Sequence, residues 1–407
     1  MKKERLQKYA RLAVEVGVNV QEGQLLIINS PVECQEFTRL LVKAAYAKKA
    51  ANVIVRWGDD LINKMYYENV SEAVLQEVPH YLVEQFKYFV DQKAAVITIS
   101  APTPGLLKDI DAKRLQLSAM ATQKAIDFYR KHMMSNGSQW CVIAYPTEAW
   151  AQKVFPGPKA FERLLDSILV ASRVRDDNDP VAEWHEHMET LARHNAMLNQ
   201  YNFLSLHFQN SLGTDLSVGL VENHLWGGGG EYTKDGIYFA PNIPTEETFT
   251  MPHKLKVNGK VVATKPLNYQ GKLIEDFWLV FKDGKVVDYD AKKEKEALKN
   301  LLEFDEGSSY LGEVALISFN SPISNMNVLF YNTLFDENAS CHLALGNAYT
   351  MSIQGGNEME ESELLAKGYN KSMTHVDFMF GSSDMKIIGI THEQKRITVF
   401  ENGNFSF

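Results

Sequence analysis

Short apolar runs alternate with amphipathic segments in the first third of the chain. Four of the runs are rich in β-branched residues, nearly continuous in hydrophobicity and closed by turn residues, as buried parallel strands are. They cover residues 25–29, 52–57, 94–100 and 140–146, while residues 1–17, 34–49 and 78–90 have the apolar spacing of helices. Repeated strand–helix–strand units of this size predict an α/β domain with a doubly wound, mostly parallel sheet.

The pattern changes after a helical segment at residues 181–199. Later segments alternate apolar and polar residues around Asn-Gly and Asp-Gly turns, which is typical of antiparallel hairpins; they cover residues 203–210, 214–220, 254–263, 273–291 and 396–403. We therefore expect two domains, an α/β scaffold over residues 1–195 and an α+β domain with mainly antiparallel strands over residues 196–407. The Trp-Gly-Gly-Gly-Gly run at residues 226–230 predicts a flexible loop.

Composition narrows the class of protein. The chain has 407 residues, of which 45% are hydrophobic, enough to build two or three cores. A net charge of −9, spread without long runs of one sign, argues against nucleic acid or a membrane as a partner. No apolar stretch follows the basic N-terminus as in a signal peptide, and no run approaches the roughly 18 residues of a membrane span. The dispersed Cys34, Cys141 and Cys341 fit reduced thiols, so we expect a cytoplasmic protein.

Carboxylates and imidazoles stand at scattered positions in otherwise apolar segments of the second half. His375 and Asp377 alternate onto one face of an expected strand, and Val376 marks its other face as buried. Glu313 heads an apolar strand, where an ionised carboxylate needs a cation or several donors. Without further information, His375, Asp377 and Glu313 could equally be polar side chains that face the solvent. Oxygen and nitrogen donors that arrive from several strands are what a divalent metal requires.

The roles of four further residues cannot be decided from the residues alone. Glu246 and Glu247 are adjacent, so on an extended chain only one of them can face a given site. His342 could be a core imidazole bonded to a carbonyl; a thiol dyad with the neighbouring Cys341 would need an unusual backbone. Tyr349 follows a turn, and its phenol could bind a metal or donate to a developing oxyanion.

Asp336 and Glu337 are candidate bases for a metal-activated water. We favour Glu337, as a base or as an additional ligand. The sequence has no His-Glu-x-x-His motif, and no nucleophile elbow, phosphate-binding loop or dinucleotide fingerprint follows a strand. Helix-borne zinc proteases, serine hydrolases and nucleotide-binding enzymes therefore lack their motifs here.

Four stretches carry a family resemblance: NIPTEETFT at residues 242–250, GEVAL at 312–316, LFDENASCHLALG at 334–346 and HVD at 375–377. In their residues, order and separations they resemble the aminopeptidase T and aminopeptidase S family of dimetal metallo-exopeptidases, and the resemblance extends over almost the whole chain. Thr248 is a departure, because an aliphatic residue is expected at that position.

The resemblance implies a metal-dependent aminopeptidase that releases N-terminal amino acids from short peptides with a free N-terminus. It implies a homodimer and a site for two divalent ions, zinc, cobalt or manganese, which activate a water. The second domain is then the catalytic, metal-binding domain and the first a substrate-access wall. The expected metal ligands are Glu247, Glu313, His342, Tyr349, His375 and Asp377, and Glu337 and Tyr349 are the expected catalytic residues.

Two alternatives remain at this stage. The first is a metal-dependent amidase or dipeptidase that uses the same ligands on small amides. The second is a non-catalytic ligand-binding protein with a structural metal, in which protein ligands would saturate the ion.

Overall fold

The computed structural model describes residues 2–407, and the chain folds into two compact units. The first unit comprises the chain through His187 together with Gly230–Pro244, and the second comprises Met188–Gly229 and Thr245–Phe407. The chain passes from one unit to the other within α10 (Pro180–Tyr201), the helix that also contains the expected boundary near residue 195.

The segment Gly230–Pro244, which we had assigned to the second domain, belongs to the first unit. Its backbone hydrogen bonds explain the difference. The Ala240 N–H donates to the Val16 and Gly17 carbonyls at 3.1 and 2.9 Å, and the Ile243 N–H donates to Val142 O at 3.0 Å. Sequence patterning cannot detect such a return, because the segment is short and its partners lie far away in the sequence.

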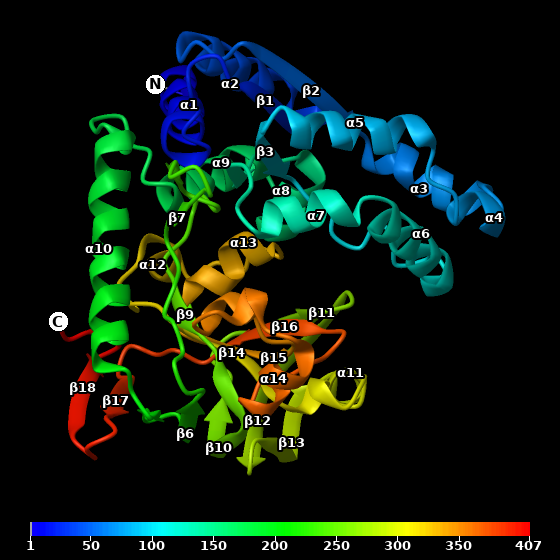
Figure 1. Cartoon of the computed structure of the whole chain (residues 1–407). Coiled ribbons are helices and arrows are strands. Elements are labelled where there is room, and N and C mark those ends of the chain that lie inside the picture. The colour runs from blue at the N-terminus through cyan, green and yellow to red at the C-terminus, as the bar shows by residue number, and fades with distance from the viewer. Residues whose placement is uncertain (1) are drawn as a thin grey trace. The chain divides into compact units, whose positions relative to one another are not determined.

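The first unit is built on a four-stranded parallel sheet with the strand order β2-β1-β3-β4 (Figure 1). The strands are β1 (Leu25–Pro31), β2 (Asn52–Gly58), β3 (Ala95–Ser100) and β4 (Trp140–Ala144), with a small β7–β8 pair (Glu231–Tyr232, Tyr238–Phe239). The helices are α1 (Lys2–Leu12), α2 (Gln35–Ala47), α3 (Asp60–Asn69), α4 (Glu72–Leu75), α5 (His80–Asp91), α6 (Ala112–Ala125), α7 (Asp127–Met134), α8 (Glu148–Val154) and α9 (Ala160–Ala171). The expected parallel strands are confirmed. Among residues 2–407, no helix is long and apolar enough to cross a membrane.

Alternation along the parallel strands buries both faces of this sheet. Leu25 and Ile27 of β1 pack with Phe89 of α5 in one core cluster. The crossover from β1 through α2 to β2 runs in the opposite direction to the crossover through α5 to β3. Right-handed connections therefore place α2 and α5 on opposite faces. Phe37 of α2 stacks on Tyr9 of α1 with ring centroids 5.1 Å apart, which gives the α2 face its own aromatic core.

The second unit contains two antiparallel sheets, as expected of an α+β domain. One has nine strands in the order β11-β12-β10-β6-β5-β17-β18-β19, with β13 added at β12, and the other has the order β16-β15-β14-β9. The strands of the larger sheet are β5 (Ser205–Gln209), β6 (Asp215–Leu220), β10 (Pro252–Val262), β11 (Leu267–Tyr269), β12 (Lys272–Lys282), β13 (Lys285–Lys293), β17 (Lys386–Ile390), β18 (Arg396–Glu401) and β19 (Asn404–Phe405). Those of the smaller sheet are β9 (Thr248–Thr250), β14 (Leu311–Leu316), β15 (His342–Gly346) and β16 (His375–Met379); the helices are α11 (Lys295–Leu302), α12 (Pro322–Met326), α13 (Thr333–Asp336) and α14 (Glu361–Ala366).

One expected hairpin turn is wrong. Asp283-Gly284 and Asn402-Gly403 do turn between paired strands, but the backbone of β10 passes straight through Asn258-Gly259. Gly259 has φ +118°, and a Cβ atom there would lie 2.2 Å from the Asp215 carbonyl oxygen of the neighbouring strand. This glycine is therefore required because two strands approach each other closely here. An Asn-Gly pair in the sequence can mark either such a contact or a turn.

Gly346 offers a test of how tightly the smaller sheet is built. It has φ +109°, and an added Cβ atom would lie 2.2 Å from the Thr374 carbonyl oxygen, directly before β16. We expect Gly346→Ala to lower the free energy of unfolding by more than about 3 kcal/mol, because backbone strain and overpacking add. Gly271→Ala is the matched control, since Gly271 has φ +81° but no atom within 4 Å of its Cβ position. Urea unfolding followed by circular dichroism compares them; equal midpoints would contradict the packing argument.

Candidate metal centre

The smaller sheet of the second unit has one apolar face and one polar face. Its apolar face packs into the large core cluster of the unit through Val314, Leu316, Leu343, Leu345 and Phe378. Because side chains alternate along a strand, the residues between them point to the other face. Those residues include Glu313, His342, His375 and Asp377. The core on one side therefore fixes where the polar groups on the other side lie.

Strand register brings the polar groups of this face together. Glu313 of β14 pairs with Ala344 of β15, and Ala344 pairs with Asp377 of β16. His342, two residues before Ala344, lies opposite Ala315. Alanine between and beside the polar residues leaves the space above the sheet to carboxylates and imidazoles. A larger side chain at Ala344 would occupy the volume between Glu313 and Asp377.

The first donor group comprises Glu247, Glu313 and His342, each with one ligand atom within 4.8 Å of the others. His342 Nε2 lies 3.3 Å from Glu313 Oε1 and 3.6 Å from Glu247 Oε2. His342 and Glu313 are buried, with 1% and 5% of their surface exposed. Of the two adjacent glutamates, Glu247 is the one in this group.

The second donor group comprises Glu313, His375 and Asp377, within the same 4.8 Å limit. His375 Nε2 lies 3.6 Å from Glu313 Oε2 and 3.4 Å from Asp377 Oδ1. The other ring nitrogen, Nδ1, donates a 2.7 Å hydrogen bond to the Asn347 carbonyl. That bond selects the tautomer whose Nε2 lone pair faces the carboxylates, the arrangement usual for a metal-binding histidine. Glu313 belongs to both groups.

The backbone of the Gly run supports the segment that carries Glu247. The Gly227 N–H donates to Phe249 O at 3.0 Å and the Phe249 N–H donates back at 2.9 Å. Gly228 has φ +122°, and a Cβ atom there would lie 2.4 Å from the Glu247 carbonyl oxygen. We expected a flexible loop at residues 226–230, but this part of it is paired with β9. The reason is that glycine permits close backbone approach as well as flexibility.

Thr248, the departure from the family pattern, is fully buried in the structure. Its hydroxyl donates a 2.7 Å hydrogen bond to Asn195 Oδ1, and Asn195 Nδ2 donates to Gly228 O at 3.0 Å. The polar side chain is thus satisfied inside the core by a partner on α10. It also ties the strand next to Glu247 to the Gly run.

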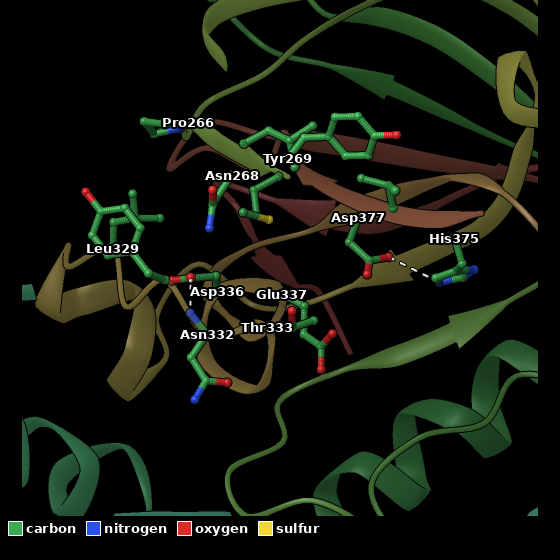
Figure 2. Close-up of a pocket in the computed structure, with 14 residues that line it drawn as sticks. Pro266, Asn268, Tyr269, Leu329, Asn332, Thr333, Asp336, Glu337, His375 and Asp377 are labelled. Atoms are coloured by element: carbon green, nitrogen blue, oxygen red, sulfur yellow. Dashed lines mark hydrogen bonds and ion pairs between the residues drawn. The ribbon is translucent and has the colours of Figure 1, made fainter. Parts of the chain in front are cut away.

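The two carboxylates before His342 have different environments. Asp336 accepts hydrogen bonds from the backbone N–H groups of Phe330 and Asn332 at 2.7 and 3.0 Å, so its oxygens are occupied in holding a turn. Both residues line the cavity that His375 and Asp377 also line (Figure 2), but after burial the charges that raise the pKa of Glu337 are those of Glu247 and Asp377, so its carboxylate belongs to the cluster. Of this pair, Glu337 has the environment that a base of the site requires.

Two asparagines that sequence reasoning missed position the candidate ligands. Asn338, fully buried, accepts a 2.7 Å hydrogen bond from the Glu246 N–H and donates to Leu334 O at 3.1 Å. It therefore joins the segment that bears Glu337 to the segment that bears Glu247. Asn338 follows Asp336 and Glu337 in a polar stretch, so nothing in the sequence marked it as buried. Asn347 acts through its backbone carbonyl, which no sequence pattern reveals.

Tyr349 lies against His375, with ring centroids 4.7 Å apart. Burial raises the pKa of its phenol, and the surrounding carboxylates, Glu313 first among them, raise it further, so the group is a proton donor. Cys341 points away from the site. Its Sγ accepts a hydrogen bond from the Ile317 N–H at 3.3 Å, and burial raises the pKa of the thiol to about 12. The geometry agrees with the expectation that Cys341 and His342 form no dyad.

Electrostatic coupling within the site is strong. Burial lowers the pKa of His342, but its hydrogen bond to Glu313 and the charges of Asp377 and Glu247 outweigh this and raise the value to about 10. Burial raises the pKa of Glu247 to about 7 against the opposing effect of His342. Burial, then Glu247 and Asp377, raise the pKa of Glu337 well above its usual range. Glu247, Glu337 and His342 therefore all hold protons more tightly than they would in water.

The donor set fits divalent cations. Four carboxyl groups, Glu247, Glu313, Glu337 and Asp377, meet two imidazoles in a mostly buried volume, and their crowding raises the pKa of Glu247 and of Glu337, so the site favours either protons or cations. Asp377 Oδ1 is buried, and within residues 2–407 its only polar contact is the 3.4 Å approach of His375 Nε2. An uncompensated buried charge is costly unless it is paired with a cation. Oxygen and imidazole donors are those that zinc, cobalt and manganese accept.

A cavity of about 250 Å³ opens beside this cluster. His375, Asp377 and Glu337 line one side of it, and Tyr269 and Leu329 contribute apolar surface (Figure 2). The His375–Asp377 contact lies at its edge. The candidate metal centre is therefore open to a small molecule on this side.

Residues 2–405 match the family described as thermophilic metalloprotease (M29). The chain belongs to this family. It is 46% identical to aminopeptidase AmpS of Bacillus subtilis, over 99% of each chain, and 44% identical to aminopeptidase 2 of Geobacillus stearothermophilus, over 99% of this chain and 98% of the relative. The solved structure of wild-type AmpT from Thermus thermophilus superposes with a TM-score of 0.92 over the whole of both chains at 35% identity. Family membership confirms the resemblance and implies a divalent metal.

A substitution of Glu313 tests the candidate ligands most directly, because Glu313 belongs to both donor groups. Glu313→Gln keeps the shape of the side chain and removes the charge, so we expect it to lose most of the bound metal. Elemental analysis after dialysis measures the metal, with circular dichroism as the check on folding. Glu306→Gln, at a position whose side chain is 93% exposed, is the matched control and should keep the wild-type content. Wild-type metal content in Glu313→Gln would exclude Glu313 as a ligand.

Proposed function

We propose that the protein is a metal-dependent aminopeptidase that removes the N-terminal residue from short peptides. The observation that carries the proposal is a buried cluster of carboxylates and imidazoles in a chain that matches aminopeptidases from end to end. The thiol of Cys341, next to His342 in the sequence, is turned into the core and offers no nucleophile to the cluster. The activity is therefore assigned to the metal centre.

The proposed site holds two divalent ions, with Glu313 shared between the two donor groups. Charge balance supports this number, because two dications offset four carboxylates when both imidazoles are neutral. Glu247 and His342 complete one group, and His375 and Asp377 complete the other. Tyr349 is proposed as a further ligand or as a donor to the substrate. Zinc, cobalt and manganese all suit this mixed donor set.

When bound, the ions supply Lewis acidity, which polarises the scissile carbonyl and lowers the pKa of a water molecule. In the proposed mechanism Glu337 accepts the proton of the attacking water and passes it to the departing amine. Burial, and then the charges of Glu247 and Asp377, raise its pKa, so its carboxylate accepts a proton more readily than an exposed glutamate does. Tyr349, whose phenol stays protonated, donates a hydrogen bond to the oxygen on which negative charge develops.

We propose that the excess of carboxylates also orients the substrate. A free N-terminus is cationic when protonated, so the carboxylates attract it. When it is neutral, its lone pair could bind a metal ion held by the site. The cavity of about 250 Å³ beside His375 and Asp377 is large enough for one residue of a peptide.

We further propose that the active form is a cytoplasmic homodimer.

A metal-dependent amidase or dipeptidase remains the second candidate, because the same ligands could act on small amides. Release of successive residues from tetrapeptides separates the two, since a strict small-amide hydrolase would leave tetrapeptides intact. A structural metal in a non-catalytic protein is disfavoured by the cavity at the centre.

Chelation tests the metal mechanism. We expect dialysis against a strong chelator to abolish peptide hydrolysis and expect added zinc, cobalt or manganese to restore it. Hydrolysis of a leucine anilide, followed by absorbance, measures the activity, and elemental analysis confirms that the metal was removed. Circular dichroism before and after chelation separates lost catalysis from lost folding. Full activity in the metal-free, folded protein would overturn the proposed mechanism.

Blocking the N-terminus tests the direction of cleavage. An acetyl group removes the charge and the lone pair of the amine, so we expect an N-acetylated peptide to be cut roughly 10⁴–10⁵-fold more slowly than its free counterpart. Mass spectrometry of a matched pair of tetrapeptides gives both rates and the order in which residues leave. Comparable cleavage of the two, or internal cuts in a denatured protein, would identify an endopeptidase instead.

A further inference from the structure

A second cavity lies wholly within the first unit, at the carboxyl ends of its parallel strands. Its volume is about 270 Å³, and residues from the ends of β1, β2 and β3 line it. In the order β2-β1-β3-β4, the connections after β1 and β3 leave in opposite directions, so β1/β3 is the switch point of the sheet. Open α/β sheets bind small molecules in the crevice outside such a point.

A polar row crosses three strands at this edge. Arg56 of β2 and Thr98 of β3 both lie in register with Asn29 of β1. Arg56 Nη1 donates to Asn29 Oδ1 at 3.0 Å, and Asn29 Nδ2 donates to Thr98 Oγ1 at 3.1 Å. The guanidinium also lies 4.9 Å from the centre of the Phe86 ring of α5. Arg56 is thus held in place by neutral groups alone.

The charge of Arg56 has no carboxylate partner anywhere in residues 2–407, although the side chain is half-buried. Burial accordingly lowers its pKa. Asp60 lines the same cavity from the start of α3, and within the described part of the chain its carboxylate has no hydrogen bond or ion pair either. The two charged groups therefore share one cavity without neutralising each other. A half-buried charge without a partner is costly and is best explained by a ligand that supplies the opposite charge.

We propose that this cavity binds a free α-amino acid as its zwitterion, with Arg56 facing the carboxylate and Asp60 facing the ammonium group. A guanidinium suits a carboxylate because its planar fork can donate two parallel hydrogen bonds. Trp57, which is 51% exposed, and Ile99 line the cavity and offer apolar surface to the side chain of the amino acid. An apolar amino acid such as leucine is the ligand class that these walls favour.

The site is separate in sequence from the metal centre, since its lining residues are those of the first unit. It goes beyond the proposed function, although free amino acids are the products that an aminopeptidase would release. The binding needs no metal ion, because both charges of the ligand are met by side chains. This difference allows the cavity to be tested with the metal centre switched off.

The test is calorimetric titration of the metal-free, full-length protein with L-leucine, N-acetyl-leucine and leucinamide, each up to about 10 mM, where a weak small-ligand site saturates. We expect saturable binding of leucine and at least about tenfold weaker binding of the other two, which each lack one charge. Arg56→Gln and Asp60→Asn should each weaken leucine binding about tenfold or more. Arg39→Gln and Asp91→Asn, at exposed positions outside the cavity, are the matched controls and should bind as the wild type does.

Circular dichroism of each variant checks the fold. If Arg56→Gln does not fold, Asp60→Asn still tests the proposal, because Asp60 lies in the first turn of α3. Absence of saturable leucine binding by the wild type would overturn the proposal. Wild-type affinity in both cavity variants would also overturn it, as would equal binding of leucine and N-acetyl-leucine. Failure of the aminopeptidase assays would leave these measurements unaffected, so the two proposals are tested separately.

Discussion

The concentration of negative charge on one face of a small sheet is the constraint on which the second unit depends. Glu313, Asp377 and Glu247 approach one another around two imidazoles, and their mutual repulsion opposes folding. The opposite face of the same sheet supplies the compensation, because Leu343 and Leu345 are completely buried there. Burying a leucine contributes about 1.5–3 kcal/mol, so a few such residues can hold the charged cluster in place. The cation that neutralises the cluster then adds binding free energy to the folded state.

Small residues make this geometry possible. Ala344 leaves room between Glu313 and Asp377, and Gly228 lets a neighbouring backbone reach the carbonyl of Glu247. Gly346 similarly allows β15 to meet the chain entering β16. The donor atoms are held within a few ångströms of one another by backbone packing, and the side chains need little freedom of their own. Such preorganisation is what binding a divalent ion with several ligands requires.

The two units use charge in different ways. At the metal centre, carboxylates outnumber the cationic groups and the imbalance selects a metal. At the edge of the parallel sheet, the guanidinium of Arg56 and the carboxylate of Asp60 share one cavity, and neither has an ion-pair partner among residues 2–407; this balance suits the proposed zwitterion. Both follow from the same rule, that a partly buried charge retains its place only where a partner or a ligand neutralises it.

Much of this protein was determined by sequence alone. The β-branched runs fixed the parallel strands, because strands covered on both faces must be apolar throughout. The alternation in His375-Val376-Asp377 likewise fixed which of these residues would share a face. Tertiary structure decided the rest. Only strand register shows that Glu313 and Asp377 meet across Ala344, and only the backbone path shows that Gly259 spans a strand and that Gly230–Pro244 returns to the first unit. The distinction is physical: side-chain alternation is set locally by each residue's neighbours, whereas register and close approach depend on partners distant in the chain.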